Sequence, residues 1–318
     1  MAATFKPAAK ARAEDLVDNV RNALKARIEN LEWMSEATKA KAIAKWETFL
    51  PKIGYPDIWR DWSDLTITRD SYYANVMAAA KFNYNHDIGK IGRPTDRKEW
   101  FMTPQTVNAY YNPTDNTINF PAAILQPPFF DAEADDAINY GGIGAIIGHE
   151  ASHGFDDQGS QFDGAGNNVN WWTKSDRGKF NARARKLVEQ FDAYTPIKDN
   201  PDAHVNGKLT LGENIAGLGG LSVAYDALQA ALAMHPPAGA EEIDGYTQNQ
   251  RFFLNWARVW RGHVREKQAL LSLNTDPHAP NALRAIAAPS NMPAFAAAFQ
   301  CKPGDAMMRP ADKLVKIW

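Results

Sequence analysis

The sequence is poor in cysteine, and Cys301 is the only one. An internal disulfide is therefore impossible, and the fold does not rely on one. A metal site built from several thiolates is excluded for the same reason. We expect Cys301 to be a partly buried thiol without a chemical role.

Long apolar runs and long runs of one charge are also missing. No stretch has enough consecutive apolar residues to span a membrane, so we expect no membrane segment in this chain. Residues 1–10 show no apolar core of the signal-peptide kind. Because the net charge is -2 and no run of Lys and Arg stands out, nucleic acid and anionic membranes are poor candidates for a partner.

The composition is that of a globular protein, with 45% apolar and 23% charged residues over 318 positions. That length can hold one large domain or two ordinary ones. Residues 11–49 carry apolar side chains at spacings of three and four, which predicts helix. These side chains are Leu16, Val20, Leu24, Ile28 and Leu31. A second helix is predicted over residues 68–85, and the glycines and proline of residues 89–94 then indicate a boundary.

The chain changes character after this boundary. Residues 107–111 and 117–120 are short and rich in β-branched and aromatic residues, with turn residues between them. We predict two strands and a turn. Most of the remainder predicts helix, interrupted by a polar loop at residues 156–170. The expected fold class is therefore α+β, mainly helical with a small sheet.

His149, Glu150 and His153 form the pattern H-E-x-x-H within an apolar segment. Residues four apart lie on the same face of a helix, so the two imidazoles can bind one Zn²⁺ ion. Glu150 is close enough in sequence to take a proton from activated water. Two surface histidines on a helix are the alternative interpretation, but an apolar helix favours the metal site.

Catalytic zinc usually takes three protein ligands. The best candidate for the third is Glu213, in the segment LGENIAGLGGL at residues 211–221. Such a segment predicts a buried helix, and a carboxylate within it needs a partner, for which a cation is suitable. Taken in isolation, Glu213 is better explained as an acid at a helix start, stabilised by the helix dipole.

Together, these segments resemble the neprilysin family of zinc peptidases, the M13 peptidases. The similar segments follow one another along the chain: VNAYYNPTDNTINFPAAILQPPFF, GGIGAIIGHEASHGFDDQGSQFDGAGN with WWT after it, GENIAGLGGL, FFLNWARVWR, and the stretch from HAPNALR to the final Trp318. The resemblance covers about residues 6–318. It implies a thermolysin-like catalytic domain, at residues 95–318, and a preceding helical segment, at residues 1–94, that corresponds to the end of the family's roofing lobe and its linkers.

The resemblance also implies roles for individual residues. His149, His153 and Glu213 would be the ligands of one zinc ion, and Glu150 would be the general base. His278 would stabilise the oxyanion of the tetrahedral intermediate. Further roles follow for a larger set. Asn108, Ala109 and Arg284 would hydrogen-bond the backbone of a peptide substrate, Ile124, Phe129, Ile146 and Trp260 would form its apolar S1′ pocket, and Asp156 would lie beside the metal helix.

Two departures from the family pattern affect the expected activity. The motif around the third ligand usually continues E-N-I-A-D, whereas this chain has Gly217 in place of the acid. In the family that acid hydrogen-bonds a metal-binding histidine, and the loss of such a partner typically costs about 10–100-fold in affinity or activity. A lesser departure is Ala151, which is smaller than the usual β-branched residue.

The second departure is length, because family members are considerably longer and carry an amino-terminal lobe over the active site. Without that lobe, we expect exposed apolar surface that is covered by a homodimer, for example through Leu24 or Leu31, or left as an open cleft. The resemblance suggests a periplasmic or extracellular location, although the compartment itself stays unknown.

The expected function is that of a zinc-dependent endopeptidase that cleaves peptide bonds on the amino side of bulky apolar residues. The alternative is a weakly active or inactive relative that binds zinc or peptides, which Gly217 and the absent lobe favour. The presence of Glu150, His278 and Arg284 favours the enzyme, because a binding protein needs no general base. A purely structural helical protein would leave the H-E-x-x-H pattern unexplained.

Overall fold

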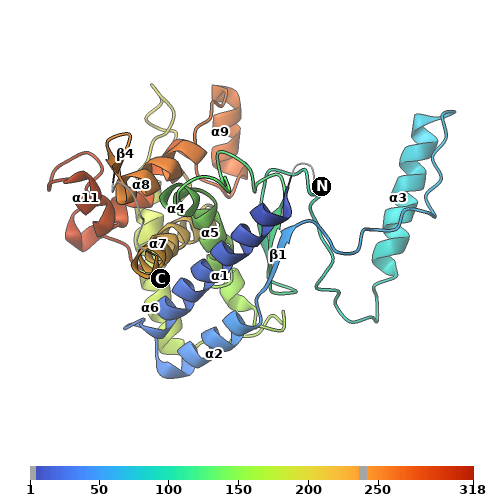
Figure 1. Ribbon diagram of the computed structural model, residues 1–318, viewed down its shortest axis with the longest axis horizontal. Coiled ribbons are helices and arrows are strands. Elements are labelled where there is room, and N and C mark those ends of the chain that lie inside the picture. Colours follow the sequence, from blue (N-terminus) through green and yellow to red (C-terminus); the bar gives the residue numbers. More distant parts are fainter. Residues whose placement is uncertain (1–4, 236–241) are drawn as a thin grey trace.

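The computed structural model describes residues 5–235 and 242–318, in which most helices form one body and a small sheet lies at its side (Figure 1). This arrangement confirms the expected class, α+β and mainly helical. The helices are α1 (Pro7–Glu29), α2 (Glu36–Glu47), α3 (Tyr72–Ile88), α4 (Asp136–Asn139), α5 (Ala145–His153), α6 (Lys174–Asp192), α7 (Leu211–Met234), α8 (Gln248–Val259), α9 (Glu266–Thr275), α10 (Asn281–Ala287) and α11 (Pro293–Phe299). A π-helical turn, Tyr140–Gly144, joins α4 to α5, and short 3-10 turns lie at Gly159–Gln161, Pro289–Asn291 and Ala311–Lys313.

The sheet has the strand order β1-β3-β2, with bounds Leu50–Gly54 for β1, Tyr110–Asn112 for β2 and Thr117–Pro121 for β3. The central strand β3 is buried along its whole length, runs parallel to β1 and antiparallel to β2. The two predicted strands are confirmed, but β2 begins at Tyr110, so Asn108 and Ala109 lie just before it rather than within it. A small hairpin, β4 (Glu242–Ile243) and β5 (Tyr246–Thr247), precedes α8.

The sequence does not predict strand β1, because Pro51 and Gly54 interrupt any strand pattern there. Proline lacks the N–H that a central strand needs, but an edge strand tolerates it. Strand β1 is such an edge, and Pro51 aligns with Ile118 of β3. The sheet therefore joins a segment of the first sixty residues to the strands that precede the H-E-x-x-H helix.

The first helices belong to the core. The predicted apolar face of α1 is confirmed, since Leu16, Val20, Leu24 and Ile28 are all buried. The helix expected over residues 11–49 is wrong in one respect, because it is interrupted between α1 and α2. In this break the Trp33 ring stacks 6.0 Å from that of Trp172, so burial of the aromatic side chain outweighs continuation of the helix.

The surface expected for a dimer through the first helices is not available. Leu24 and Leu31 are both buried inside the chain, with 0% and 4% of their surface exposed. A homodimer through some other surface stays a prediction.

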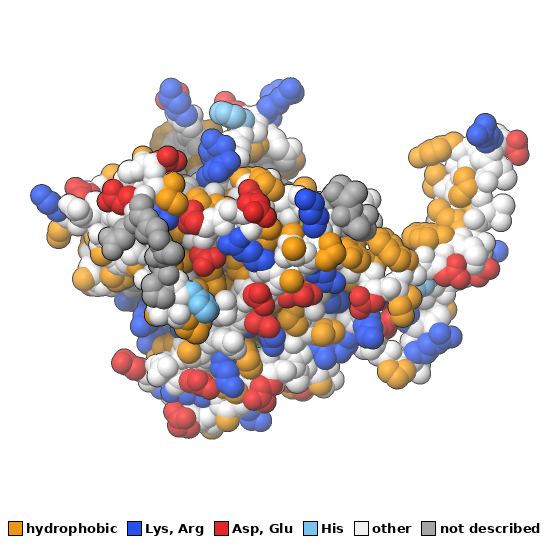
Figure 2. Space-filling model, in the orientation of Figure 1, with side chains coloured by type: hydrophobic (Ala, Val, Ile, Leu, Met, Phe, Trp, Pro, Cys, Tyr) orange, Lys and Arg blue, Asp and Glu red, His pale blue; other side chains and the backbone are white. Residues whose placement is uncertain are grey.

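Residues 55–107, which we call the arm, carry α3, and this helix lies away from the rest of the molecule (Figure 1). The last part of the arm returns to the body, where Arg97 donates to the carbonyl oxygen of Asp115 and Pro104 accepts the N–H of Ala123. None of the residues of α3 is buried. Apolar side chains are exposed along the arm, and the orange side chains at the right of Figure 2 belong to this part of the chain. The exposed large side chains are Ile58, Trp59, Trp62, Ile67, Tyr72, Tyr73, Val76, Met77, Tyr84, Ile88, Ile91, Phe101 and Val107.

The domain boundary expected near residue 94 stays a prediction. On the side before this boundary, α1, α2 and β1 pack with the helices and strands that follow it, and α3 of the arm stands apart (Figure 1).

Helices α5 and α7 lie in backbone contact at the centre of the molecule. A Cβ atom on Gly220 would lie 2.3 Å from the backbone nitrogen of His149, and one on Gly148 would lie 2.6 Å from the carbonyl oxygen of Gly220. Both distances are far shorter than any van der Waals contact. The two helices can approach this closely only because both positions are glycine.

Helix α7 also corrects the expectation that no segment is long enough for a membrane. By length and apolar composition alone it is the one helix in residues 5–235 and 242–318 that could cross a bilayer, and 67% of its apolar window is buried inside the molecule. A core helix passes the same test. Because α7 contacts α5, α1 and α6, we interpret it as the central core helix of this fold.

The glycine contact predicts opposite effects for two substitutions on α7. Gly220→Ala forces a methyl group into the backbone of α5, and we expect it to lower the free energy of unfolding by at least about 1–3 kcal/mol. Gly217→Ala is the matched control, because a Cβ there meets nothing within 4 Å. Alanine is favoured over glycine in a helix by about 1 kcal/mol, so this variant should be as stable as the parent or more so. Urea denaturation measures both, and equal stabilities would contradict the packing described.

Candidate metal and catalytic site

Helix α5 holds the H-E-x-x-H residues rigidly. Its first eight residues, from Ala145 to Ser152, are all buried. Only 5% of the surface of His149 and 6% of that of Glu150 are exposed. His153 is the last residue of the helix, and its imidazole is turned toward that of His149, as expected for positions four apart.

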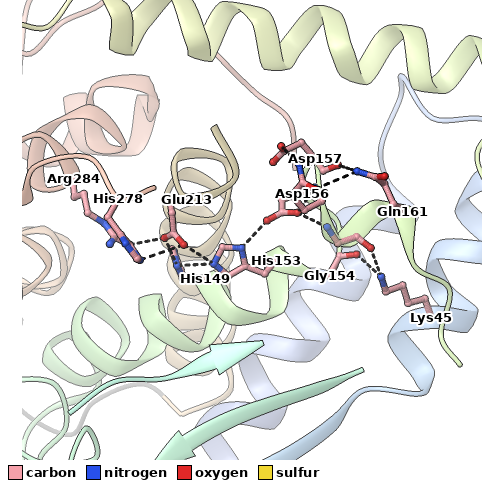
Figure 3. Close-up of polar contacts among 12 residues, drawn as sticks. Lys45, His149, His153, Gly154, Asp156, Asp157, Gln161, Glu213, His278 and Arg284 are labelled. Carbon is pink, nitrogen blue, oxygen red and sulfur yellow. Dashed lines mark hydrogen bonds and ion pairs between the residues drawn. The ribbon is translucent and has the colours of Figure 1, made fainter. Parts of the chain in front are cut away.

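Three side chains meet at one point (Figure 3). The Nε2 atoms of His149 and His153 are 3.0 Å apart. Glu213, near the start of α7, places one carboxylate oxygen 3.1 Å from the Nε2 of His149 and the other 3.5 Å from the Nε2 of His153. Tetrahedral zinc with bonds of about 2.0–2.1 Å would separate its ligand atoms by about 3.3–3.4 Å. The donor types and spacings therefore fit one zinc ion.

The Glu213 carboxylate is ionised in spite of its burial. Burial alone would raise its pKa, but the imidazole of His149, with His153 and Arg284, holds the pKa of Glu213 well below its usual range. Burial lowers the pKa of His149 to about 4, and the neighbouring His153 adds to this effect. A neutral imidazole and an ionised carboxylate are the forms that bind a metal ion.

Asp156 orients the second histidine. Its Oδ2 lies 2.7 Å from the Nδ1 of His153, so a proton on Nδ1 leaves the Nε2 lone pair free to bind a metal. Its Oδ1 accepts the backbone N–H groups of Gln158 and Gly159 at 2.8 and 2.6 Å. Burial opposes protonation of His153, but the Asp156 carboxylate raises the pKa of His153 to about 9, so that metal binding there displaces a proton.

Glu150 differs from the other acids of the site. Burial raises its pKa to about 7, an effect that the charges of His153 and Arg284 only partly offset. The backbone amide of Tyr111, in β2, also hydrogen-bonds to this carboxylate. A carboxyl group with a pKa near neutral can both accept and return a proton.

His278 and Arg284 reach the site from the carboxy-terminal part of the chain (Figure 3). The Nε2 of His278 lies 3.3 Å from Glu213, and its Nδ1 lies 2.8 Å from the carboxylate of Asp276. Arg284 lies 3.4 Å from the second oxygen of Glu213. Its guanidinium stacks 4.0 Å over the Trp260 ring, which fixes its plane.

A cleft of about 510 Å³ contains every site residue that the sequence indicated. The arrangement brings the candidate metal-binding side chains, the acid and the apolar side chains to one surface. The predicted residues that line the cleft are Asn108, Ala109, Ile124, Phe129, Ile146, His149, Glu150, His153, Asp156, Glu213, Trp260, His278 and Arg284.

Sequence reasoning missed Tyr111 and Gln158, which also line the cleft. Tyr111 acts through its backbone amide, and no side-chain pattern indicates such a role. Gln158 donates a backbone N–H to Asp156 from the polar loop that follows α5. The only signal for either was its place beside a predicted site residue.

A helix that carries H-E-x-x-H, with a glutamate from a second helix completing the ligand set, defines the class of zinc-dependent peptidases. The sequence profile of peptidase family M13 matches residues 108–315, and the amino-terminal profile of the same family matches residues 1–56. The chain belongs to peptidase family M13.

Named relatives agree with this assignment. The chain is 40% identical to Neprilysin-11 of Caenorhabditis elegans over 99% of its own length and 38% of the relative's. It is 38% identical to human Endothelin-converting enzyme 1, over 97% of its own length and 40% of the relative's. Among solved structures, an inhibitor complex of zinc metalloprotease 1 from Mycobacterium tuberculosis superposes with a TM-score of 0.93 at 50% identity, covering 98% of this chain and 47% of that one. The chain thus spans less than half the length of these relatives.

The ligand set predicts the result of removing one donor. Loss of an outer hydrogen-bond partner costs about 10–100-fold in affinity. Glu213→Ala should reduce zinc affinity by more than this, because it would remove a proposed direct ligand. Glu266→Ala, an exposed acid at the start of α9, is the control and should retain the wild-type zinc content. Metal analysis after dialysis measures both. Wild-type zinc in Glu213→Ala would mean that the third ligand is misassigned.

Proposed function

We propose that this chain is the catalytic part of a zinc-dependent endopeptidase that hydrolyses peptide bonds on the amino side of bulky apolar residues. The observation that carries the proposal is the meeting of three ligand atoms at tetrahedral spacing beside a buried acid, within one cleft. One zinc ion per chain would be held by His149, His153 and Glu213. Zinc in such a site supplies Lewis-acid chemistry, activating water and polarising a carbonyl group.

Glu150 supplies the proton transfer. Its carboxyl group, whose pKa burial raises to about 7, would accept a proton from the attacking water and then donate it to the leaving amine. His278 would donate a hydrogen bond to the oxygen that gains negative charge in the transition state. The contact of its Nδ1 with Asp276 orients the ring for that task.

The substrate backbone would lie along β2. This strand is an edge of the sheet, since its one neighbour is β3, and an edge can pair with an extended peptide. Asn108 and Ala109 precede β2 at the cleft and would continue the pairing, while Arg284 would bind a peptide carbonyl. A bulky apolar side chain just after the cleaved bond would enter the pocket between the apolar residues Ile124, Phe129, Ile146 and Trp260.

One experiment tests the proposed function. Wild-type protein and Glu150→Gln are incubated with a mixture of short unstructured peptides, and the products are mapped by mass spectrometry alongside the zinc content. The wild type should cleave before Leu, Ile, Phe and similar residues. Glu150→Gln should keep its zinc and lose about 10²–10⁴-fold in rate, since proton transfer is lost and ligation is not. Glu189→Gln, an exposed acid on α6, is the control. An active Glu150→Gln protein would falsify the mechanism.

A second candidate function, a weakly active relative, is supported by one observation at His149. Within the described residues, its buried Nδ1 has no hydrogen-bond partner. Helix α7 places the Glu213 carboxylate against the Nε2 of this ring and Gly220 against its backbone, and Gly217 lies between them on the same helix face. A Cβ on Gly217 would meet nothing within 4 Å, and a cavity of about 20 Å³ lies beside it. The histidine therefore lacks the partner that would fix its tautomer.

Restoring an acceptor should strengthen the site. Gly217→Asp would place a carboxylate in open space one turn after Glu213, on the same face of α7. If it reaches the Nδ1 of His149, we expect zinc affinity to rise by about 10–100-fold with a parallel gain in peptidase rate. Gly217→Ala fills the same space without an acceptor and is the control. Competition with a zinc chelator measures the affinity. Equal affinities in the two variants would show that the unpaired Nδ1 does not limit the site, and the weakly active alternative would lose its support.

A further inference from the structure

Lys45 is a buried lysine on α2, far in sequence from the metal site. Only 2% of its surface is exposed. Its Nζ donates to the carbonyl oxygens of Gly154 and Gly159 at 2.7 Å each and of Phe162 at 2.8 Å. All three N–H bonds of the ammonium group are therefore used, and each ends on the backbone.

A lysine of this kind is costly to bury. It forms no ion pair with any carboxylate of the residues that the structure describes, so hydrogen bonds to neutral carbonyls replace its hydration. Burial lowers the pKa of Lys45 to about 7, although the charges of Asp156 and Asp163 oppose the shift. The three hydrogen bonds offset part of the cost of burial, and they hold the three carbonyl groups together.

The three carbonyls bracket the residue that orients His153. Gly154 directly follows α5, Gly159 and Phe162 lie on the far side of the turn, and Asp156 lies between them. Gly159 takes part twice, because its N–H binds the Oδ1 of Asp156 at 2.6 Å while its carbonyl binds Lys45. Asp156 then contacts the Nδ1 of His153 at 2.7 Å. The hydrogen bonds therefore run from Lys45 through Gly159 and Asp156 to His153, and Figure 3 shows the bonds of Lys45 and the contact of Asp156 with His153 on the same side of the site.

The same ammonium group also touches the sheet side of the site. It lies 5.7 Å from the ring centres of Tyr111 and Phe155. The backbone amide of Tyr111 hydrogen-bonds to Glu150. Lys45 therefore lies where the edge strand, the end of α5 and the loop after it converge.

We propose that Lys45 is a positioning residue of the metal site, which holds the two ends of the loop at residues 154–162 so that Asp156 keeps the His153 ring in its binding orientation. This inference rests on the proposed function, because it takes His153 as a zinc ligand. It assigns a part of the metal site to residues 1–56, outside the segment at residues 108–315 that the main family profile matches.

The test is a double-mutant cycle on zinc affinity, measured by chelator competition with the full chain. Lys45→Met keeps the stem length and removes the three N–H donors, and Asp156→Asn weakens the contact with His153. We expect each single variant to bind zinc about 10–100-fold more weakly than wild type. The double variant should bind no more weakly than Asp156→Asn alone, because both changes act on the same contact. Lys41→Met, exposed and one turn earlier on α2, is the matched control and should keep wild-type affinity.

A spectroscopic measurement separates positioning from stability. The imidazole N–H proton that His153 shares with Asp156 should give a strongly shifted NMR signal in the metal-free wild type. That signal should move or broaden in Lys45→Met and stay in place in Lys41→Met. If Lys45→Met does not fold, Lys45→Gln, which keeps an amide donor, takes its place, and a zinc affinity between those of wild type and Asp156→Asn is expected.

Two results would overturn the proposal. One is wild-type zinc affinity in Lys45→Met, or in Lys45→Gln, with only a lower melting temperature, which is the mark of a purely structural lysine. The other is strict additivity in the cycle, since Lys45 would then act independently of Asp156. His153→Ala separates these from a failure of the proposed function: if that variant binds zinc as wild type does, the ligand assignment itself is wrong.

Discussion

The site depends on the backbone contact between α5 and α7. Two of the proposed ligands lie on one helix and the third on the other, so the distance between the helix axes sets the distance between His149 and Glu213. Gly148 and Gly220 fix that distance at the limit of van der Waals contact. Side chains of any size between the helices would repack in several ways, whereas two glycine backbones in contact have one closest approach. The metal geometry is in this sense a property of the main chain.

The charged groups near that contact give Glu213 and Glu150 different surroundings. The Glu213 carboxylate is surrounded by His149, His153, His278 and Arg284, all within 3.5 Å. A buried anion with so many donors around it is stable only as a carboxylate, which is what a ligand must be. Glu150, by contrast, has one backbone donor and a raised pKa, as a group that exchanges protons needs. Their neighbours thus give the two glutamates of this cleft different protonation behaviour.

The proposed ligands could be predicted from the sequence because their signal is local. His149 and His153 are one helical turn apart, and the family motifs assigned Glu213 and the cleft residues to the same site. Features that arise from contacts between distant segments could not be predicted. Strand β1 contains a proline and ends at a glycine, and only its pairing with β3 makes it a strand. Lys45 is one of several lysines on α2, and only its burial against residues 154–162 distinguishes it. The interruption between α1 and α2 at Trp33 likewise depends on Trp172, far along the chain.

The arm has a consequence for how the chain is connected. It leaves the body after Gly54, which pairs with Pro121, and returns before Tyr110, which pairs with Asn119. Both of its ends are therefore held on either side of β3, about two strand spacings or 10 Å apart. In topological terms the arm is an insertion, and the body on either side of it stays joined through the sheet and through the packing of α1 on α7. A protease that cut within the arm would break the chain into two pieces without separating them, and the metal-binding helices would lie wholly in one piece while Lys45 lay in the other.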